Sequence, residues 1–271
     1  MTVDLVIATV LLRPYVFGFL AAFLVAGVLD MGWRRTLLFG ACVSPIVWLA
    51  EVSSTRIGVP FGLYHYTGDT RDRELFLANV PLMDPLSFAF LAYASFCLAR
   101  AVLRGRQVSA SGLALATGLL MMILDVVIDP AAVRGDRWFL GRIFFYAEEG
   151  LYFGVPLSNF AGWVLVGAVG TRFYCWIGGR GAGSSRGWPD REGRGSDTRG
   201  LPTPADPCGR RTWPGIALYY AVLAFNLAVT AWIGEWLLLL VGVAVHVVTA
   251  AGLWIVRQRP AVRLGLEKQR A

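Results

Sequence analysis

Four carboxyl side chains lie inside strongly apolar stretches of the sequence, where an ionisable group is costly and therefore points to function. Two of them, Asp125 and Asp129, are four residues apart. In a helix they share one face on successive turns, with Cβ atoms roughly 6 Å apart. Two carboxyls this close in a medium of low dielectric constant do not both ionise readily. The pair therefore predicts one carboxyl that keeps its proton near neutral pH, the state that a general acid needs.

Glu51 and Asp84 are the other two members of this set. Glu51 lies near the end of one apolar stretch and Asp84 just inside the next. Pro130 directly follows Asp129, removes one backbone donor and disfavours helical geometry in the residue before it. We therefore expect the helix to kink or end at Asp129, which would free a backbone carbonyl to hold a water molecule.

A purely structural interpretation of these carboxyls is also open. In it, Asp129 pairs with Arg134 or caps a neighbouring helix, and Glu51 pairs with Arg56. Such ion pairs stabilise helix ends at a membrane boundary without taking part in chemistry. This interpretation fits any one of the acids better than it fits all of them together.

Two segments between apolar stretches combine glycine, proline and aromatic residues. The first, 51–66, ends with Tyr64 and Tyr66, which point the same way if the segment is extended. The second, 129–163, contains four further candidates: Arg134, Trp138, Tyr152 and Asn159. Aromatic belts at the membrane interface account for some of the rings. Irregular backbone at membrane depth, however, is tolerated only where it lines a cavity, so we expect both segments to line one site.

The elements that must position these residues are membrane-spanning helices. Of the 271 residues, 56% are hydrophobic and only 16% are charged, so the bilayer is the natural solvent for the chain. Stretches long enough to cross about 30 Å of hydrocarbon lie at 14–33, 36–53, 81–103, 111–133, 154–171, 214–232 and 236–256. We therefore predict an all-α, polytopic membrane protein with about seven transmembrane helices. Val3–Leu12 is too short to span alone, and Arg13 and Pro14 follow it, which predicts an interfacial lead-in or a kinked extension of the first span.

The formal net charge of +7 predicts orientation and not a nucleic-acid partner, because the basic residues lie in loops between spans. Their distribution favours a multi-pass protein of the cell membrane with its N-terminus outside and its C-terminus in the cytoplasm. We divide the chain into a five-span core that holds the site, a disordered cytoplasmic linker, and a two-span hairpin with a basic tail. These parts are residues 1–177, 178–213 and 214–271.

Metal chemistry is not expected from the sequence. The four cysteines show no paired spacing and no nearby histidine pattern, so neither a disulfide nor a zinc site is predicted. With His65 and His246 as the only histidines, neither a three-histidine metal site nor the eight-histidine diiron centre of membrane desaturases can be assembled.

Several of these pieces occur together in a known family. Their order and spacing over roughly residues 50 to 163 resemble the integral-membrane carotenoid biosynthesis proteins, which include the CruF-type carotenoid 1′,2′-hydratases. The matching pieces are Glu51, the stretch Gly58–Tyr66, Val80–Leu82, Asp125 with Asp129 and Pro130, Arg134 with Trp138, and the stretch Tyr152–Trp163. The resemblance implies hydration of the terminal double bond of an acyclic (ψ) carotenoid end, which gives a tertiary alcohol.

The residues fit the chemistry that the resemblance implies. Protonation at C-2′ and capture of the C-1′ cation by water change no oxidation state, so no cofactor is expected. Asp125 or Asp129 supplies the proton in this interpretation, while the other carboxylate or Glu51 orients the water and accepts its proton. Substrate binding is assigned to Tyr64, Tyr66, Asp84, Arg134, Trp138, Tyr152 and Asn159. The expected partners are an acyclic carotenoid, the lipid bilayer and neighbouring carotenoid-modifying enzymes.

Four other functions were weighed against hydration. A membrane lycopene-type cyclase is the nearest alternative, because it begins with the same protonation and differs in what captures the cation. A prenyltransferase needs two acidic clusters for Mg²⁺-diphosphate, and the sequence offers only the Asp125/Asp129 pair. A retinal-type photoreceptor needs a lysine in its last helix, whereas the only lysine is Lys268 in the tail. A transporter stays a weaker alternative, since no internal repeat is visible.

Overall fold

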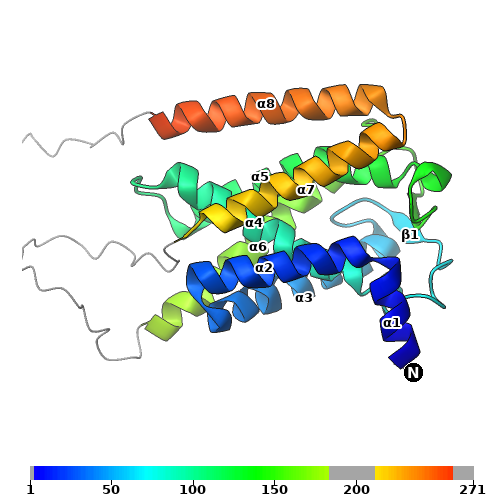
Figure 1. Ribbon diagram of the computed structural model, residues 1–271, viewed down its shortest axis with the longest axis horizontal. Coiled ribbons are helices and arrows are strands. Elements are labelled where there is room, and N and C mark those ends of the chain that lie inside the picture. The colour runs from blue at the N-terminus through cyan, green and yellow to red at the C-terminus, as the bar shows by residue number, and fades with distance from the viewer. Residues whose placement is uncertain (1–2, 183–210, 259–271) are drawn as a thin grey trace, which may run out of the picture.

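The computed structural model describes residues 3–182 and 211–258, and it confirms an all-α, polytopic architecture. Within the described residues, seven helices are long and apolar enough to cross a membrane. They are α2 (Pro14–Met31), α3 (Trp33–Ile57), α4 (Met83–Leu103), α5 (Ala110–Ala132), α6 (Leu157–Ala182), α7 (Trp213–Trp232) and α8 (Trp236–Gln258). Figure 1 shows them running in roughly the same direction as one bundle.

The helices extend beyond several of the predicted apolar stretches. Helix α6 has 26 residues and ends at Ala182, whereas the apolar stretch ends at residue 171. A helix of this length is about 39 Å long and so reaches past the hydrocarbon core into the headgroup region. The exposed Arg172 interrupts the apolar sequence, but apolar residues follow it, and the stretch of α6 that is long and apolar enough to span a membrane runs from Leu157 to Gly178. Residues 183–210, most of the predicted linker, lie outside the described residues.

The first apolar segment forms a separate helix, α1 (Val3–Leu12), set at an angle to α2 (Figure 1). The break falls at Arg13, whose φ of −120° and ψ of 49° are not helical, and Pro14 then starts α2. Proline is well suited to the first helical position, because its missing N–H has no partner there in any helix. The predicted kink after Leu12 is thus confirmed, and it turns the Arg13 side chain inward, where it is buried.

Helix α4 forms the centre of the bundle and α8 its periphery. In α4, 72% of the residues in an apolar stretch of 18 residues are buried, compared with 6% in the corresponding stretch of α8. Ala92, Tyr93 and Phe96 of α4 are fully buried on the inside of the bundle. Helix α8 instead exposes leucine, valine and tryptophan side chains, which is typical of a face solvated by lipid.

Helices α5 and α6 meet at their backbones. A Cβ added at Gly167 would lie 2.9 Å from the Cα of Gly118, and one at Gly118 would overlap with the carbonyl oxygen of Val164. Small residues at such a contact let two helices approach closely in a membrane. The close approach sets the position of the acidic end of α5 against the first turns of α6.

Helix α7 is part of the same bundle although it follows the segment 183–210. The Tyr219 hydroxyl donates to the carbonyl of Leu120 on α5 at 3.0 Å. At the entrance to α7, the backbone N–H of Arg211 donates to Asp30 of α2 at 3.3 Å. Asp30 also accepts from Arg100 of α4 at 2.7 Å, so one buried carboxylate connects three elements. These contacts bring the inner face of α7 against the helices that carry the acidic residues.

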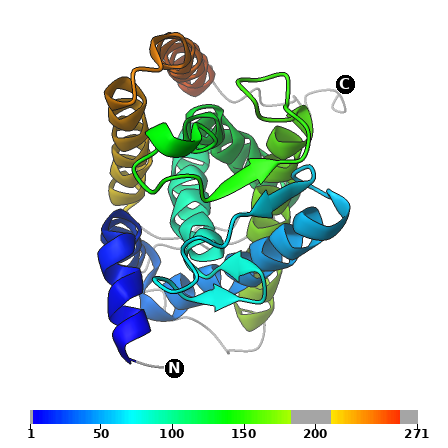
Figure 2. The same cartoon turned by 90° about the vertical axis from the view of Figure 1, so that its right-hand side faces the viewer.

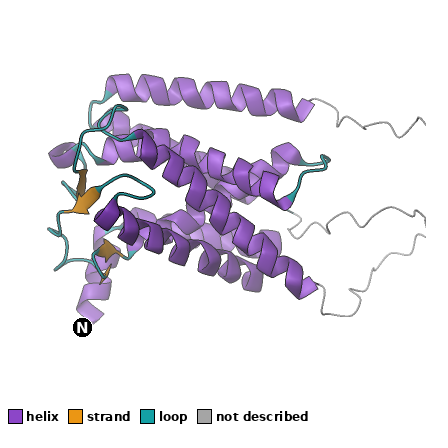
Figure 3. Ribbon diagram, turned by 180° about the vertical axis from the view of Figure 1, so that it is seen from behind, coloured by secondary structure: helices purple, strands orange, loops and turns teal. Residues whose placement is uncertain are grey.

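The two glycine- and proline-containing loops lie at one end of the bundle, as predicted. Strand β1 (Tyr64–Tyr66) pairs antiparallel with β4 (Phe144–Tyr146), so the loops 54–80 and 134–153 are joined directly. A second pair, β2 (Phe76–Leu77) with β3 (Val80–Pro81), closes the first loop on itself. Figures 1, 2 and 3 show these strands at one end, while α6 ends and α7 begins at the other.

We expect the strand end of the bundle to face the outside of the cell, because the basic residues concentrate at the other end. Asp72 lies in an exposed loop at the strand end and Gln107 in the exposed α4–α5 turn at the other end. In a background with Cys175 and Cys208 replaced by serine, Asp72→Cys should react with an impermeant maleimide on intact cells. Gln107→Cys should react only after the membrane is permeabilised. Equal labelling of both cysteines on intact cells would contradict this orientation.

Candidate active site

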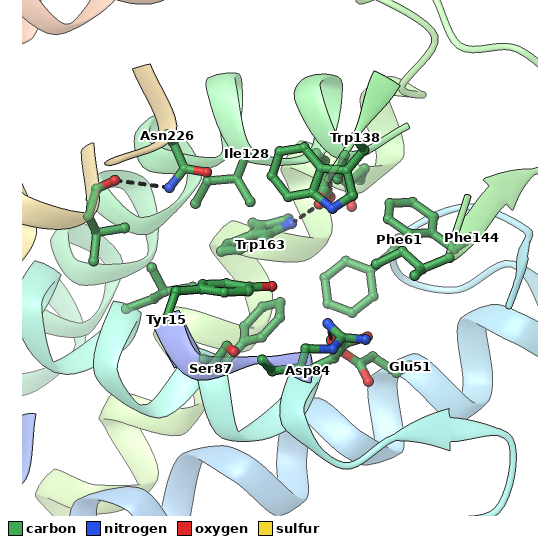
Figure 4. A pocket seen from close by; sticks show the side chains of 18 of the residues that line it. Tyr15, Glu51, Phe61, Asp84, Ser87, Ile128, Trp138, Phe144, Trp163 and Asn226 are labelled. Atoms are coloured by element: carbon green, nitrogen blue, oxygen red, sulfur yellow. Dashed lines mark hydrogen bonds and ion pairs between the residues drawn. The ribbon is translucent and has the colours of Figure 1, made fainter. Parts of the chain in front are cut away.

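A cavity of about 150 Å³ lies at the strand end of the bundle (Figure 4). Six of the spanning helices, α2 to α7, contribute side chains to its lining, and so do β1, β4 and the loop after α5. Its walls are mainly aromatic, with a small number of carboxyl and amide groups among the rings. A space of this size suits a group about as large as a benzene ring.

One wall carries the paired aspartates of α5 and two side chains of α6. The Nδ2 atom of Asn159 donates to Oδ2 of Asp125 at 2.7 Å and to Oδ2 of Asp129 at 2.8 Å. The indole N–H of Trp163 also reaches Oδ2 of Asp129, at 3.3 Å. Asp129 lines the cavity, whereas Asp125 lies behind it and is fully buried. The two carboxyls therefore share one helix face, as predicted, and one amide group holds both.

Helix α5 does not end at Asp129, which was one of the two outcomes expected from Pro130. It continues to Ala132, and Pro130 lies inside it. Because proline has no N–H, the carbonyl of Val126 four residues earlier lacks its helical partner. The hydroxyl of Tyr152 donates to this carbonyl at 3.2 Å. A side chain from the following loop thus supplies the missing donor, and the helix continues past the aspartates to Ala132.

Another wall of the cavity carries Glu51 of α3 and Asp84 of α4. Tyr64 and Tyr66 of β1 line the same cavity. Glu51 is only 3% exposed, and its Oε2 atom has no hydrogen-bond partner among the described residues. A buried carboxyl oxygen without a donor is favourable only in the protonated, neutral form.

A buried guanidinium adjoins this second wall. Arg13 donates to both carboxylate oxygens of Glu74, at 2.8 and 3.0 Å, and to Asp84 at 2.9 Å. Burial alone lowers the pKa of Arg13, but the charges of Asp84 and Glu74 outweigh burial and raise this pKa above its ordinary value. Arg13 therefore stays charged and pairs with both carboxyl groups, although its single positive charge can neutralise only one of them.

Charge balance around the cavity leaves three carboxyls without a cation. In the described part of the chain, neither Glu51 nor Asp125 nor Asp129 forms an ion pair. Full ionisation of all three would bury uncompensated negative charge, which is very unfavourable in a medium of low dielectric constant. Simultaneous ionisation of all three is therefore disfavoured, which is the condition that the prediction of one protonated carboxyl requires.

Aromatic rings make up most of the remaining lining. Phe88 stacks on Trp163 with ring centroids 4.3 Å apart, and Tyr64 packs edge-on against Tyr66 at 5.5 Å. Tyr64 and Tyr66 thus point the same way, as the extended-strand expectation required. Burial raises the pKa of Tyr64, Tyr66 and Tyr146 well above its usual value, so these phenols stay neutral. Ring faces of this kind stabilise a nearby cation.

The structure brings most of the sequence-predicted site residues to this cavity. Those that line it are Glu51, Tyr64, Tyr66, Asp84, Asp129, Trp138 and Asn159. Three do not line it: Asp125 lies behind Asn159, Tyr152 bonds to Val126, and Arg134 lies 3.3 Å from Glu235 in the turn before α8. Among the ion pairs of residues 3–182 and 211–258, neither Asp129–Arg134 nor Glu51–Arg56 occurs, so these two expected ion pairs are not formed.

Sequence reasoning missed several residues of the cavity. Arg13 was interpreted only as the end of an apolar segment, although a charged residue inside apolar sequence is itself a signal. Trp163 was part of the motif but not assigned to the site. Phe225 and Asn226 come from α7, and no local pattern in the sequence marks them.

Within the residues that the structure describes, no group of three or more histidine, cysteine, aspartate or glutamate side chains is arranged to hold a metal ion. Asp84 and Glu74, the acids nearest to a second acidic cluster, both pair with Arg13.

This combination of buried acids, aromatic rings and spanning helices can be compared with known proteins. Residues 8–186 match the family described as Carotenoid biosynthesis protein. The chain belongs to this family. The match includes α2 to α6 and both loops of the cavity, while α7 and α8 lie beyond it.

A curated relative narrows the comparison. The chain is 31% identical over 146 residues to bisanhydrobacterioruberin hydratase of Haloarcula japonica, an alignment that covers 54% of this chain and 47% of the relative. The chain thus matches about half the length of that protein. No solved structure matches the chain. The family and the relative place this multi-pass membrane protein in carotenoid biosynthesis, as a homologue of a hydratase.

Proposed function

We propose that this protein adds water across the terminal 1′,2′ double bond of an acyclic carotenoid end group, without a cofactor. The observation that carries the proposal is the cavity itself. Glu51 of α3 and Asp129 of α5 both line it, and aromatic side chains surround them. Hydration of an isolated alkene needs a proton donor and a base that activates water, both inside a site that protects a cation. The family and the hydratase relative support the same reaction class.

The dimensions of the cavity fit one end of such a substrate. About 150 Å³ accommodates the branched terminal unit of a polyene but not the whole chain. The reacting double bond would then lie among the rings of Phe61, Phe88 and Trp163, while the conjugated part stays among apolar side chains. The geometry favours a substrate that inserts its end and reacts there.

The hydrogen bonds around the cavity favour Glu51 as the acid and Asp129 as the base, whereas the sequence alone favours Asp125 or Asp129 as the acid. Oδ2 of Asp129 accepts from Asn159 and Trp163, an arrangement that stabilises a carboxylate and suits a base. Oε2 of Glu51 has no donor, which suits a protonated acid. Asp125 belongs to the aspartate pair but does not face the cavity, so it acts on Asp129 and not on the substrate.

The reaction then proceeds in two steps. Glu51 transfers its proton to C-2′, and the double bond becomes a tertiary cation at C-1′, stabilised by the ring faces of Trp163 and Tyr64. Water adds to C-1′ while Asp129 accepts one of its protons, and transfer of that proton back to Glu51 restores the site. The buried indole N–H of Trp138, which lines the cavity and has no partner among the described residues, can bind the water or the new hydroxyl group. The net change is the gain of one water molecule with no change in oxidation state.

The test is to express the gene in a strain that accumulates lycopene and to measure the mass of the new pigment. A gain of one or two water molecules supports hydration. An unchanged mass with a shifted absorption spectrum would mean cyclisation, the alternative in which an internal double bond captures the cation. The purified protein in detergent should also form the product without NAD(P)H, flavin, O₂ or added metal. A strict requirement for O₂ with a reductant would overturn the proposal.

A further inference from the structure

The cavity holds only the end of a long substrate, so the rest of the chain must leave it through an opening. We propose that the polyene enters sideways from the bilayer, between α2 and α7, past a gate of four rings: Tyr15, Phe19, Phe139 and Phe225. This inference rests on the proposed function, because it takes an acyclic carotenoid as the substrate. It adds a route by which the substrate enters and four residues that select what can pass, neither of which the hydration reaction itself requires.

The four rings form one connected layer. Tyr15 stacks on Phe225 with centroids 5.3 Å apart, and Phe19 meets Phe225 edge-on at 5.6 Å. Phe139 meets Tyr15 at 5.3 Å and Phe225 at 6.3 Å. Phe225 therefore lies at the centre of the layer, in contact with all three of the other rings.

The layer of four rings faces the cavity on one side and the membrane on the other. Tyr15, Phe19 and Phe225 line the cavity, and none of them is fully buried. Phe139 is 38% exposed on the outside of the bundle. Figure 1 shows the ribbons of α2 and α7 diverging toward the strand end, and these rings fill the space between the two helices. The layer thus joins rings that line the cavity to a ring exposed on the outside of the bundle.

Two other boundaries of the cavity are closed by backbone. Beside the cavity, Asn159 and Trp163 of α6 donate to Asp129 of α5, and farther along the same two helices the backbones touch at Gly118 and Gly167, which holds α5 against α6. At the strand end, the pairing of β1 with β4 covers the cavity with a hydrogen-bonded ladder. A ring turns about two side-chain torsions within nanoseconds to microseconds, whereas separation of these backbone contacts needs a larger rearrangement. The aromatic layer is therefore the boundary that opens most readily.

An ion-pair clip positions the outer part of the gate. Glu235, in the turn between α7 and α8, pairs with Arg134 at 3.3 Å and also with Arg137. Both arginines precede Trp138, which lines the cavity, and Phe139, which belongs to the gate. The clip thus ties the loop after α5 to α7 across the gate, which gives Arg134 a positioning role instead of a contact with the substrate.

The chemistry of the gate fits a conjugated chain and not a polar ligand. A flat polyene can pass between ring faces with continuous van der Waals contact, and three of the four rings are phenylalanines without any polar atom. The path then leads directly to the acidic cavity, so the branched end of the chain arrives first. Polar lipids meet no charged side chain in the gate that would hold a headgroup.

The experiment measures uptake of an acyclic carotenoid by the protein in lipid nanodiscs, separately from product formation. Lycopene is supplied in donor vesicles, and the rate of pigment transfer is followed by absorbance. Phe225→Trp narrows the gate and should slow uptake about five-fold or more, a factor typical of added crowding at a packed position. Phe225→Ala should speed uptake. Phe173→Trp is the matched control, because Phe173 is a half-exposed ring of α6 away from the gate. Pigment uptake by the Phe173→Trp variant should equal uptake by the unmodified protein.

The outcomes separate this inference from the proposed function. Uptake that responds to Phe225 without any hydrated product would support the gate and overturn the hydratase proposal. Hydrated product together with uptake that is the same in Phe225→Trp, Phe225→Ala and Phe173→Trp would overturn the gate alone. No pigment uptake by the unmodified protein would overturn both.

Discussion

Glu51→Gln is expected to reduce the product formed per folded molecule by about 10²- to 10⁴-fold, the contribution typical of a general acid. Glutamine has nearly the shape of the protonated acid but cannot deliver a proton to carbon. Because Glu51 forms no ion pair among the described residues, the substitution leaves no buried cation unpaired. Folding and pigment binding should therefore persist. The measurement is product per membrane-inserted protein in cells that supply an acyclic carotenoid.

Asp129→Asn should cause a loss of similar size, but for a different reason. If Asp129 is the base, protonation of the substrate by Glu51 still occurs in this variant, while capture of water fails. In D₂O, the substrate recovered from Asp129→Asn should then carry deuterium at C-2′, and the substrate recovered from Glu51→Gln should not. The opposite pattern would make Asp129 the acid and Glu51 the base.

A matched control for both variants is available in the same loop region. Glu148 is an exposed glutamate after β4 and does not line the cavity. Glu148→Gln removes one negative charge at the strand end without touching the cavity, so activity should stay unchanged. Near-normal activity per folded molecule in both Glu51→Gln and Asp129→Asn would remove these carboxyls from the mechanism.

Arg13→Met is expected to destabilise the folded protein by about 3–5 kcal/mol, because it leaves the carboxylate of Glu74 buried without its partner. The Arg13 side chain is 3% exposed and that of Glu74 is fully buried, so water cannot replace the lost bonds. The arginine also touches Asp84, so activity should fall together with stability. Thermal unfolding in detergent and the yield of inserted protein measure the effect.

Two further variants separate the charge of Arg13 from its bonding geometry. Arg13→Lys keeps the charge but loses the two-pronged contact with Glu74, so its stability should lie between those of the methionine variant and the unmodified protein. The comparison pair is Arg137 with Glu235, in which the arginine side chain is 55% exposed. Arg137→Gln should cost less than about 1 kcal/mol, as exposed ion pairs usually do. An equally small effect of Arg13→Met would contradict the structural role of the buried cluster.

Much of the architecture follows from the sequence because the bilayer imposes strict local rules. A spanning helix must satisfy its backbone hydrogen bonds internally and present about 20 apolar residues, so composition alone predicts seven spans. The shared face of Asp125 and Asp129 follows from the 3.6-residue helical period, and the common direction of Tyr64 and Tyr66 from the two-residue period of a strand. These relations join residues two to four positions apart, where the backbone geometry leaves few choices.

The composition of the site depends on contacts that no local period encodes. Arg13 meets Glu74 across 61 positions of the chain, and Asn159 meets Asp125 across 34. The sequence shows a proline after Asp129, but only the fold brings the Tyr152 hydroxyl to the carbonyl that this proline leaves without a partner. In the same way, Arg134 pairs with Glu235 instead of Asp129, because the loop after α5 packs against the turn between α7 and α8. Sequence by itself determined which side chains can donate or accept a proton inside the membrane, whereas tertiary packing decided which of them face the cavity, since a helix has several faces and only its neighbours select one.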